Sequence, residues 1–366
     1  KVALVERFGE NDVIVWDEAI MASQMKVNDR DIDSCWYHSM VHTYNAWDIT
    51  CGSSAVVVAV LDDGFELNHE DLKGKSIKPY NVYTRDGDVS ELESHHGTHV
   101  AGIILAEANN GIGMAGVAPK CSLMPIKVYD SNGNCTFSAM MDAILYAVYN
   151  RADVVNISLE TMWGDSLSEM KQNELIRTYF KAEERIWKSI FATANRNHTT
   201  VVIAAGNENV LAGIEPMQRS ENVIVVAAVD ANTESIRKSD FSNWGRYTDV
   251  SAPGRGIYGT VGKNDYACLS GTSFAAPIVS GAVALMKTLN DELTTKQILT
   301  ILERTGLQTK GRVGRLIQID EALLCVQDNI LPPSATQGSL QILLNWNDKN
   351  DLDLYCTDPS GERIYY

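Results

Sequence analysis

The feature that most constrains this chain is a set of five short Val- and Ile-rich runs without polar alternation. Such runs are typical of strands that are covered on both faces, as in a parallel sheet. Three other segments carry apolar residues at three-and-four spacing, which indicates amphipathic helices. The alternation of the two patterns predicts an α/β fold with a mainly parallel central sheet. The strand runs are 54–64, 121–130, 152–160, 199–208 and 222–230, and the helical segments are 96–108, 137–151 and 175–195.

Length and charge limit the functions open to such a fold. The 366 residues suffice for one large domain or two modest ones. Lys and Arg number 31 against 47 Asp and Glu, a formal net charge of -16. Because phosphate binding needs a basic face, neither nucleic acid nor an anionic membrane surface is an expected partner, whereas a basic ligand is. No run of eighteen uncharged apolar residues occurs, so we expect no membrane span.

Polar residues stand where the strand runs end. The first run stops at Asp62-Asp63-Gly64, another at Ser158 and a third at Gly206-Asn207, while a helical segment begins near His96. In parallel sheets, binding sites form at the carboxyl ends of the strands. Each residue alone has an ordinary reading as a turn or a packed side chain. Their joint occurrence in one chain predicts a functional site.

Four segments, VAVLDDG, HGTHVAG, VVIAAGNE and SGTSFAAPIVSGAVAL, resemble the signatures of the subtilisin-like serine proteases, the subtilase family, and occur in that family's order. The resemblance spans about residues 36–305 and implies a three-layer subtilisin-like fold. Carried over by motif, it makes Ser273 the nucleophile, His96 the general base and acid, and Asp62 the carboxylate that orients His96. Asn207 would supply the side-chain donor of the oxyanion hole.

The proposed chemistry explains why these residue types are needed. A serine hydroxyl is a poor nucleophile until an imidazole takes its proton, and the imidazole needs a buried carboxylate to fix its tautomer. The oxyanion formed by the attack needs donors already in place, here the Asn207 amide and the Ser273 N–H. The resemblance therefore implies a secreted or cell-envelope endopeptidase that acts on proteins or peptides through an acyl-enzyme. We expect the flanking His95 and His99 to be structural.

Substrate preference is predicted from the strand ending Ser158-Leu159-Glu160, which in the family forms one wall of the primary specificity pocket. A carboxylate on that wall would favour a cationic side chain. Asp63 and the following NHEDL also resemble the kexin and furin branch, which cuts after basic residues. These features predict a preference for basic residues before the cut. The alternative is that Glu160 points into solvent and Asp63 caps a turn.

A structural calcium site is implied by two further segments, NHEDL and EANNGIGM. Calcium prefers six to eight oxygen ligands on a bendable loop, which a glycine-rich stretch with Asn can provide. An ordinary turn is the alternative. The ligand set that the resemblance implies consists of the side chains of Asp71 and Asn110 and the backbone carbonyls of Ala108, Ile112 and Met114.

The two ends of the chain differ from the middle in sequence pattern. Residues 1–33 are predicted to be an N-terminal extension or a propeptide remnant, so a propeptide or an inhibitor is a possible partner. The peptidase domain is predicted over 34–325 and a Pro/Ser linker over 326–338. Residues 339–366 read as the first hairpin of a β-sandwich that resembles the P domain of convertases. The seven cysteines lack CxxC spacing and their odd number leaves at least one thiol unpaired.

Two other readings stay open at this point. One is a catalytically silent relative that binds peptides as a scaffold. The other concerns the range of protein substrates: the enzyme would process one partner protein and would not be a broad protease. The sequence leaves the oligomeric state undecided.

Overall fold

A parallel sheet of eight strands forms the centre of the protein. The computed structural model describes residues 27–330 except 92–93, 160–166 and 232–234, and the backbone of two strands near the end of the chain. The sheet strands are β1 (Val57–Asp62), β2 (Tyr80–Asn81), β3 (Ser122–Lys127), β4 (Val154–Ile157), β5 (Thr200–Ala204), β6 (Val223–Val229), β7 (Val250–Pro253) and β10 (Arg315–Leu316). Their order is β10-β7-β6-β5-β4-β1-β3-β2, and neighbouring strands pair in parallel. The predicted sheet is therefore confirmed.

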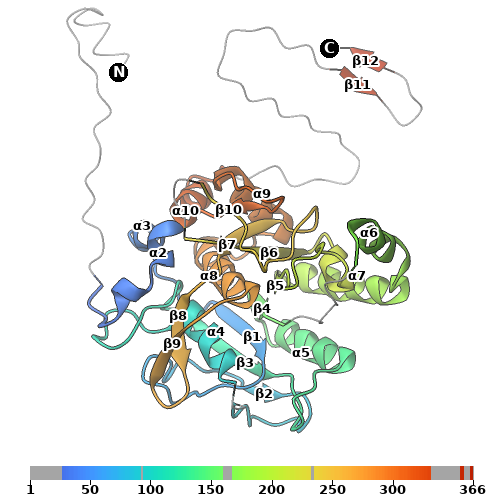
Figure 1. Cartoon of the computed structure of the whole chain (residues 1–366). Coiled ribbons are helices and arrows are strands. Elements are labelled where there is room, and N and C mark those ends of the chain that lie inside the picture. Colours follow the sequence, from blue (N-terminus) through green and yellow to red (C-terminus); the bar gives the residue numbers. More distant parts are fainter. Residues whose placement is uncertain are drawn as a thin grey trace, which may run out of the picture. The chain divides into compact units, whose positions relative to one another are not determined.

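Helices cover both faces of this sheet (Figure 1). Alternate residues of β1 face opposite ways: Val58 and Val60 join the core beneath α4 and α8, while Ala59 and Leu61 join the core beneath α5 and α7. This explains why the strand runs lack polar alternation. The helices are α2 (Tyr37–Met40), α3 (Thr43–Trp47), α4 (His96–Leu105), α5 (Phe137–Tyr149), α6 (Glu169–Thr178), α7 (Lys181–Arg196), α8 (Thr272–Leu289), α9 (Thr295–Thr305) and α10 (Ile319–Gln327), with short 3-10 turns η1 (Ile32–Ser34) and η2 (Pro216–Arg219).

The connections of β1 create the place for a site. From β1 the chain passes through α4 to β3 on one side, and it later returns as β4 on the other side of β1. Crevices form where the strand order reverses in this way, outside the carboxyl ends of the strands. Asp62 is the last residue of β1 and lies at this point.

One sequence expectation about helices needs correction. The predicted helix 175–195 is two helices, α6 and α7, because Tyr179 is extended and Phe180 has a left-handed φ of 57°. Pro277 is the sixth residue of α8, which begins at Thr272. A proline there leaves a backbone carbonyl one turn earlier without its helical donor.

The sequence reading did not single out an antiparallel hairpin, β8 (Ile257–Val261) with β9 (Asp265–Leu269). The hairpin packs on α4 and leads directly into α8. Within the described part of the chain, one helix, α8, is long and apolar enough to span a membrane, and 89% of its apolar window is buried in the core. Its apolar character is explained by this burial.

The chain divides into two compact units, 1–332 and 333–366. In the second unit, β11 (Tyr355–Thr357) and β12 (Arg363–Tyr365) pair antiparallel, as expected of a hairpin. The rest of the predicted C-terminal module lies outside the described residues. In the first unit, the backbone of Asp31 donates to Gly113 at 2.7 Å, so the described end of the predicted N-terminal extension contacts the folded body. The predicted domain boundaries stay predictions.

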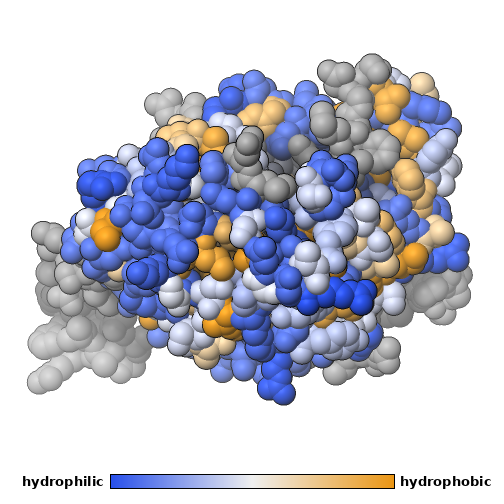
Figure 2. Space-filling view, turned by 90° about the horizontal axis from the view of Figure 1, so that it is seen from below, coloured by the Kyte–Doolittle hydropathy of each residue, from blue (hydrophilic) through white to orange (hydrophobic). Residues whose placement is uncertain are grey.

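The surface fits the acidic, polar composition. Figure 2 shows one face of the protein as mostly hydrophilic, with hydrophobic residues scattered in small groups. Scattered apolar residues of this kind are normal on a protein surface and do not by themselves indicate an interface.

Candidate active site

Asp62 and His96 form a hydrogen-bonded pair at the carboxyl end of β1. His96 is the first residue of α4, and its Nδ1 lies 2.7 Å from Oδ1 of Asp62. The Asp62 carboxylate is fully buried, and its Oδ1 also accepts the backbone N–H of Asp63 at 2.9 Å. The other oxygen, Oδ2, is buried without a hydrogen-bond partner. A buried carboxylate on Nδ1 holds the imidazole in the tautomer that keeps Nε2 for proton transfer.

Asp63, predicted to contact substrate, is buried beside the start of α4. Its side chain is 6% exposed, and its carboxylate accepts the backbone N–H of Gly97 at 2.9 Å and the hydroxyl of Ser94. Burial, and then the charge of Asp62, raise the pKa of Asp63 to about 7. A Cβ on Gly97 would lie 2.3 Å from the carbonyl oxygen of Gly64, so the close approach of α4 to this turn requires glycine. Asp63 therefore anchors the helix that carries His96. The substrate contact of Asp63 stays a prediction.

Ser273 lies at the start of α8, beside the side chain of Asn207. Asn207 Oδ1 accepts the backbone N–H of Thr272 at 2.8 Å and its hydroxyl at 3.2 Å. These bonds fix which end of the Asn207 amide is oxygen, so the other end carries the N–H donors. The N-terminal end of a helix also favours negative charge, because its first N–H groups have no helical acceptor. The arrangement suits an oxyanion.

The starts of α4 and α8 meet at Phe274, the residue after Ser273. The ring of His96 lies 5.4 Å from the ring of Phe274, and the ring of His99 lies 4.6 Å from it. His99 is buried and bonds through Nε2 to the carbonyl of Ala267 at 3.1 Å, and burial lowers its pKa to about 4. His99 is thus a neutral packing residue, while His96 lies beside the helix that carries Ser273.

Ser158 and Leu159, both predicted to contact substrate, follow β4 next to Ser273. The hydroxyl of Ser273 donates to the carbonyl of Ser158 at 2.9 Å, and the hydroxyl of Ser158 donates to the carbonyl of Ser273 at 2.8 Å. Leu159 separates two hollows, which share Leu159, Glu215 and Met217 as walls. Glu160 lies outside the described residues.

The two hollows differ in size and lining. The Leu159 hollow, between Leu159 and β5, has a volume of about 20 Å³ and includes Glu208 and Glu215 among its walls. The Trp187 hollow has a volume of about 180 Å³. It is lined by Tyr129, Cys135, Thr136, Phe137, Met140, Ile157, Leu159, Glu183, Trp187, Glu215 and Met217. The sequence reading missed these three glutamates.

The predicted calcium residues come together, but not as oxygen ligands of a cation. Asp71 is buried, and its carboxylate accepts Nδ2 of Asn110 at 2.7 Å, the N–H of Met114 at 3.0 Å and the hydroxyl of Tyr266 at 2.8 Å. Asn110 Oδ1 accepts the N–H of Ile112 at 2.7 Å, which turns the amide nitrogen toward Asp71. In this arrangement the Asp71 carboxylate is satisfied by hydrogen bonds from the loop and from Tyr266. The calcium site at this loop stays a prediction.

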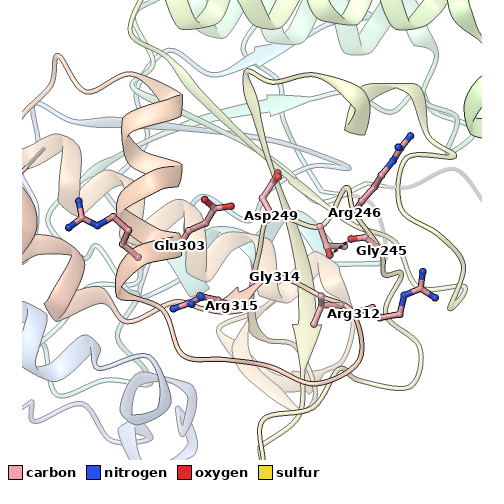
Figure 3. A pocket seen from close by; sticks show the side chains of 10 residues that line it. Gly245, Arg246, Asp249, Glu303, Arg312, Gly314 and Arg315 are labelled. Carbon is pink, nitrogen blue, oxygen red and sulfur yellow. Dashed lines mark hydrogen bonds between the residues drawn. The ribbon is translucent and has the colours of Figure 1, made fainter. Parts of the chain in front are cut away.

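A separate hollow of about 870 Å³ lies near the amino ends of β7 and β10, the edge of the sheet opposite to the site (Figure 3). Burial raises the pKa of Asp249 to about 7, and the charge of Glu303 adds to the effect. Figure 3 shows the guanidinium groups of Arg246 and Arg312 extending away from Asp249. Arg312 pairs with Glu169 at 3.0 Å. We assign this hollow no role.

The comparisons with known proteins agree with this geometry. The profile of the subtilase family, a peptidase family, matches residues 53–324. The thermophilic serine proteinase of Bacillus sp. (strain AK1) is 40% identical over 278 residues, which cover 75% of this chain and 63% of that protein. Thermitase of Thermoactinomyces vulgaris is 37% identical over 266 residues, which cover 73% of this chain and 86% of thermitase. The solved structure of a protease from Pseudoalteromonas arctica matches with a TM-score of 0.68 and 29% identity, and covers 82% of this chain and 99% of its own.

Proposed function

Because the chain belongs to the subtilase family of serine peptidases, we propose that it is an endopeptidase that hydrolyses peptide bonds in proteins through an acyl-enzyme. The observation that carries the proposal is the 2.7 Å bond between His96 and the buried carboxylate of Asp62, beside the helix that begins with Thr272 and Ser273. An imidazole held in this way can act as a general base, and the hydroxyl of Ser273 is the group whose proton it would accept.

The reaction follows from the positions of these groups. Ser273 Oγ attacks the carbonyl carbon of the substrate, and its proton passes to Nε2 of His96, since Nδ1 is engaged with Asp62. His96 then gives that proton to the leaving amine, and the C–N bond breaks to leave an ester on Ser273. A water molecule repeats the sequence on the ester, so that acid and serine are released. Asp62 stays ionised and stabilises the imidazolium.

Charge that develops on the carbonyl oxygen is met by fixed donors. The nitrogen of the Asn207 amide and the N–H of Ser273 provide two hydrogen bonds, and the first turn of α8 adds its partial positive charge. Because Thr272 holds the Asn207 amide in place, little reorganisation is needed during the reaction.

We assign the predicted preference for basic residues to Glu183, Glu208 and Glu215, which line the two hollows. The Trp187 hollow pairs aromatic walls with Glu183 and Glu215, and Glu183 accepts a bond from Nε1 of Trp187 at 3.3 Å. A long cationic side chain can lay its methylene stem on such walls and place its charge beside the carboxylates. Glu208, beside the Leu159 hollow, adds a third negative charge close to the cleft.

The silent-scaffold alternative loses force because Asp62, His96, Asn207 and Ser273 are all present, with the hydrogen bonds described above. A secreted or cell-envelope location and a propeptide or inhibitor as partner follow from the family resemblance. Calcium has no step in the reaction. The hydrogen bonds at Asp71 argue against calcium at that loop.

Hydrolysis of an unstructured protein substrate tests the proposal. The wild type should cleave it, whereas Ser273→Ala should reduce cleavage by several orders of magnitude without loss of folding. Equal cleavage by the two proteins would overturn the assignment of Ser273.

A library of peptides tests the preference. Peptides with Lys or Arg near the cut should be favoured by the wild type, and Glu183→Gln with Glu215→Gln should reduce that preference. Glu303→Gln, which removes one charge at the opposite edge of the sheet, is the matched control. A preference unchanged in the double variant would remove these carboxylates from the proposal.

A further inference from the structure

Pro277 leaves the nucleophile's own carbonyl without its helical donor. In an α-helix the N–H of one residue bonds to the carbonyl four residues earlier, so the donor for the Ser273 carbonyl would come from position 277. Proline has no N–H. The first half of α8 is buried, and a buried carbonyl without a partner is unfavourable. Another group must satisfy it.

Ser158 is that group. Its hydroxyl donates to the carbonyl of Ser273 at 2.8 Å, across 115 positions of the chain. In return, the hydroxyl of Ser273 donates to the carbonyl of Ser158 at 2.9 Å. The end of β4 and the start of α8 are therefore joined by two reciprocal bonds at the nucleophile itself.

A buried chain of side chains fixes the direction of the Ser158 hydroxyl. Nδ2 of Asn156 donates to Oγ of Ser158 at 2.9 Å, and the hydroxyl of Ser280 donates to Oδ1 of Asn156 at 2.8 Å. Asn156 and Ser280 are fully buried and Ser158 is 2% exposed. Since Oγ of Ser158 already accepts a bond from Asn156, its own proton is directed to Ser273. Buried polar chains that are satisfied in this way rigidify the segments they join.

We propose that Ser158, supported by Asn156 and Ser280, is a positioning residue of the peptidase. Its hydroxyl holds the backbone carbonyl of Ser273, which has no helical donor because residue 277 is a proline. The inference rests on the proposed role of Ser273 as nucleophile. A fixed backbone keeps the Ser273 hydroxyl within reach of His96 and keeps the Ser273 N–H aimed at the oxyanion. The hydroxyl of Ser273 turns from the carbonyl of Ser158 to His96 for the attack.

A double-mutant cycle between Ser158 and Pro277 tests this role. The readouts are kcat, KM and the rate at which a fluorophosphonate inactivates the enzyme. Ser158→Ala should lower kcat and the inactivation rate by roughly 10- to 100-fold with little change in KM, because small misplacements of reacting groups are costly. Pro277→Ala restores an N–H to the helix. The double variant Ser158→Ala/Pro277→Ala should therefore regain most of the rate.

Controls separate positioning from general stability. Ser251→Ala removes a buried hydroxyl that donates to the carbonyl of Gly314 at 2.9 Å and should leave all three readouts unchanged. Should Ser158→Ala not fold, Ser280→Ala removes the far end of the chain of bonds. It should lower the inactivation rate several-fold at constant KM.

These outcomes distinguish the positioning role of Ser158 from the proposed role of Ser273 as nucleophile. A wild type that resists the fluorophosphonate would remove the proposed nucleophile. A reactive wild type with an equally reactive Ser158→Ala variant would overturn the positioning role. A double variant as slow as Ser158→Ala would overturn the link through Pro277, and so would a Ser280→Ala variant that reacts at the wild-type rate.

Discussion

Two adjacent aspartates at the end of β1 take different roles. Asp62 and Asp63 are neighbours in sequence, yet one carboxylate holds the imidazole of His96 and the other holds the backbone of Gly97 and the hydroxyl of Ser94. Both are buried, so their charges oppose each other at short range. Burial, and then the charge of Asp62, raise the pKa of Asp63 to about 7, so Asp63 holds a proton more readily than a free aspartate does.

The raised pKa of Asp63 predicts how stability depends on pH. Its ordinary pKa is 3.8 and its pKa in the folded protein is about 7, so the folded state binds the proton more tightly. The resulting stabilisation is complete below about pH 4 and is lost as the pH rises through about 7. Asp63→Asn should therefore lose less stability than the wild type between pH 5 and pH 9. Thermal unfolding at both pH values measures this, and parallel losses in the two proteins would contradict it.

Asn207 yields a prediction about rate. Asn207→Ala should lower kcat by about 10²–10³, the loss known for the equivalent donor of subtilisin, with little change in KM. Asn173→Ala on α6 is a control that leaves the oxyanion site intact. A raised KM with unchanged kcat would mean that Asn207 binds the substrate and not the transition state.

At the scale of elements, the site depends on contacts that join segments far apart in sequence. The hairpin β8–β9 packs on α4, which carries His96, and leads directly into α8, which carries Ser273. Tyr266 on β9 is an example, since its hydroxyl donates to Asp71 at 2.8 Å and to Glu70 at 3.1 Å. Burial raises the pKa of Asp71, while the hydrogen bonds from Asn110, Met114 and Tyr266 oppose that rise.

This arrangement predicts a loop held by hydrogen bonds in place of a metal. Tyr266→Phe should lower the free energy of unfolding by about 1–3 kcal/mol, because a buried carboxylate loses one donor. Tyr258→Phe, which removes a hydroxyl bonded to Asp31 at 3.0 Å, is the matched control. A chelator should shift the thermal midpoints of the wild type and of Asp71→Asn equally. A shift in the wild type that Asp71→Asn abolishes would restore the calcium site.

Short local patterns in the sequence predict strands and motif residues, but they do not predict contacts between distant segments. The strand runs predicted the parallel sheet, and Asp62 lies at the carboxyl end of β1 as the pattern indicated. The catalytic roles of Asp62, His96, Asn207 and Ser273 stay a proposal. The break at Phe180 could not be read, because its left-handed backbone lies inside an apolar pattern that continues through it. The exchange of bonds between Ser158 and Ser273 also escapes the sequence, since it depends on where two distant segments pack.

At the scale of the whole molecule, the charge is unbalanced. The chain carries a formal net charge of -16, and three glutamates lie beside the two hollows near Ser273. A negative surface attracts cationic ligands over distances of about one Debye length, roughly 8 Å at physiological salt. The charge thus supports the proposed preference at long range as well as in the cleft.

Salt should therefore affect substrates differently. For peptides with several Lys or Arg residues, kcat/KM should fall as NaCl rises from about 0.01 to 1 M, because screening weakens the attraction. For neutral peptides of the same length it should change little. Equal salt dependence for both kinds of peptide would contradict electrostatic selection.

The most direct test of the account is to find which atom a fluorophosphonate modifies. The protein is treated with the reagent, digested and mapped by mass spectrometry, while loss of peptide hydrolysis is followed in parallel. We expect one phosphonyl group, on Ser273, formed in step with the loss of activity and greatly slowed in His96→Ala. Modification at another residue, or full hydrolysis by protein that carries the group on Ser273, would contradict the account.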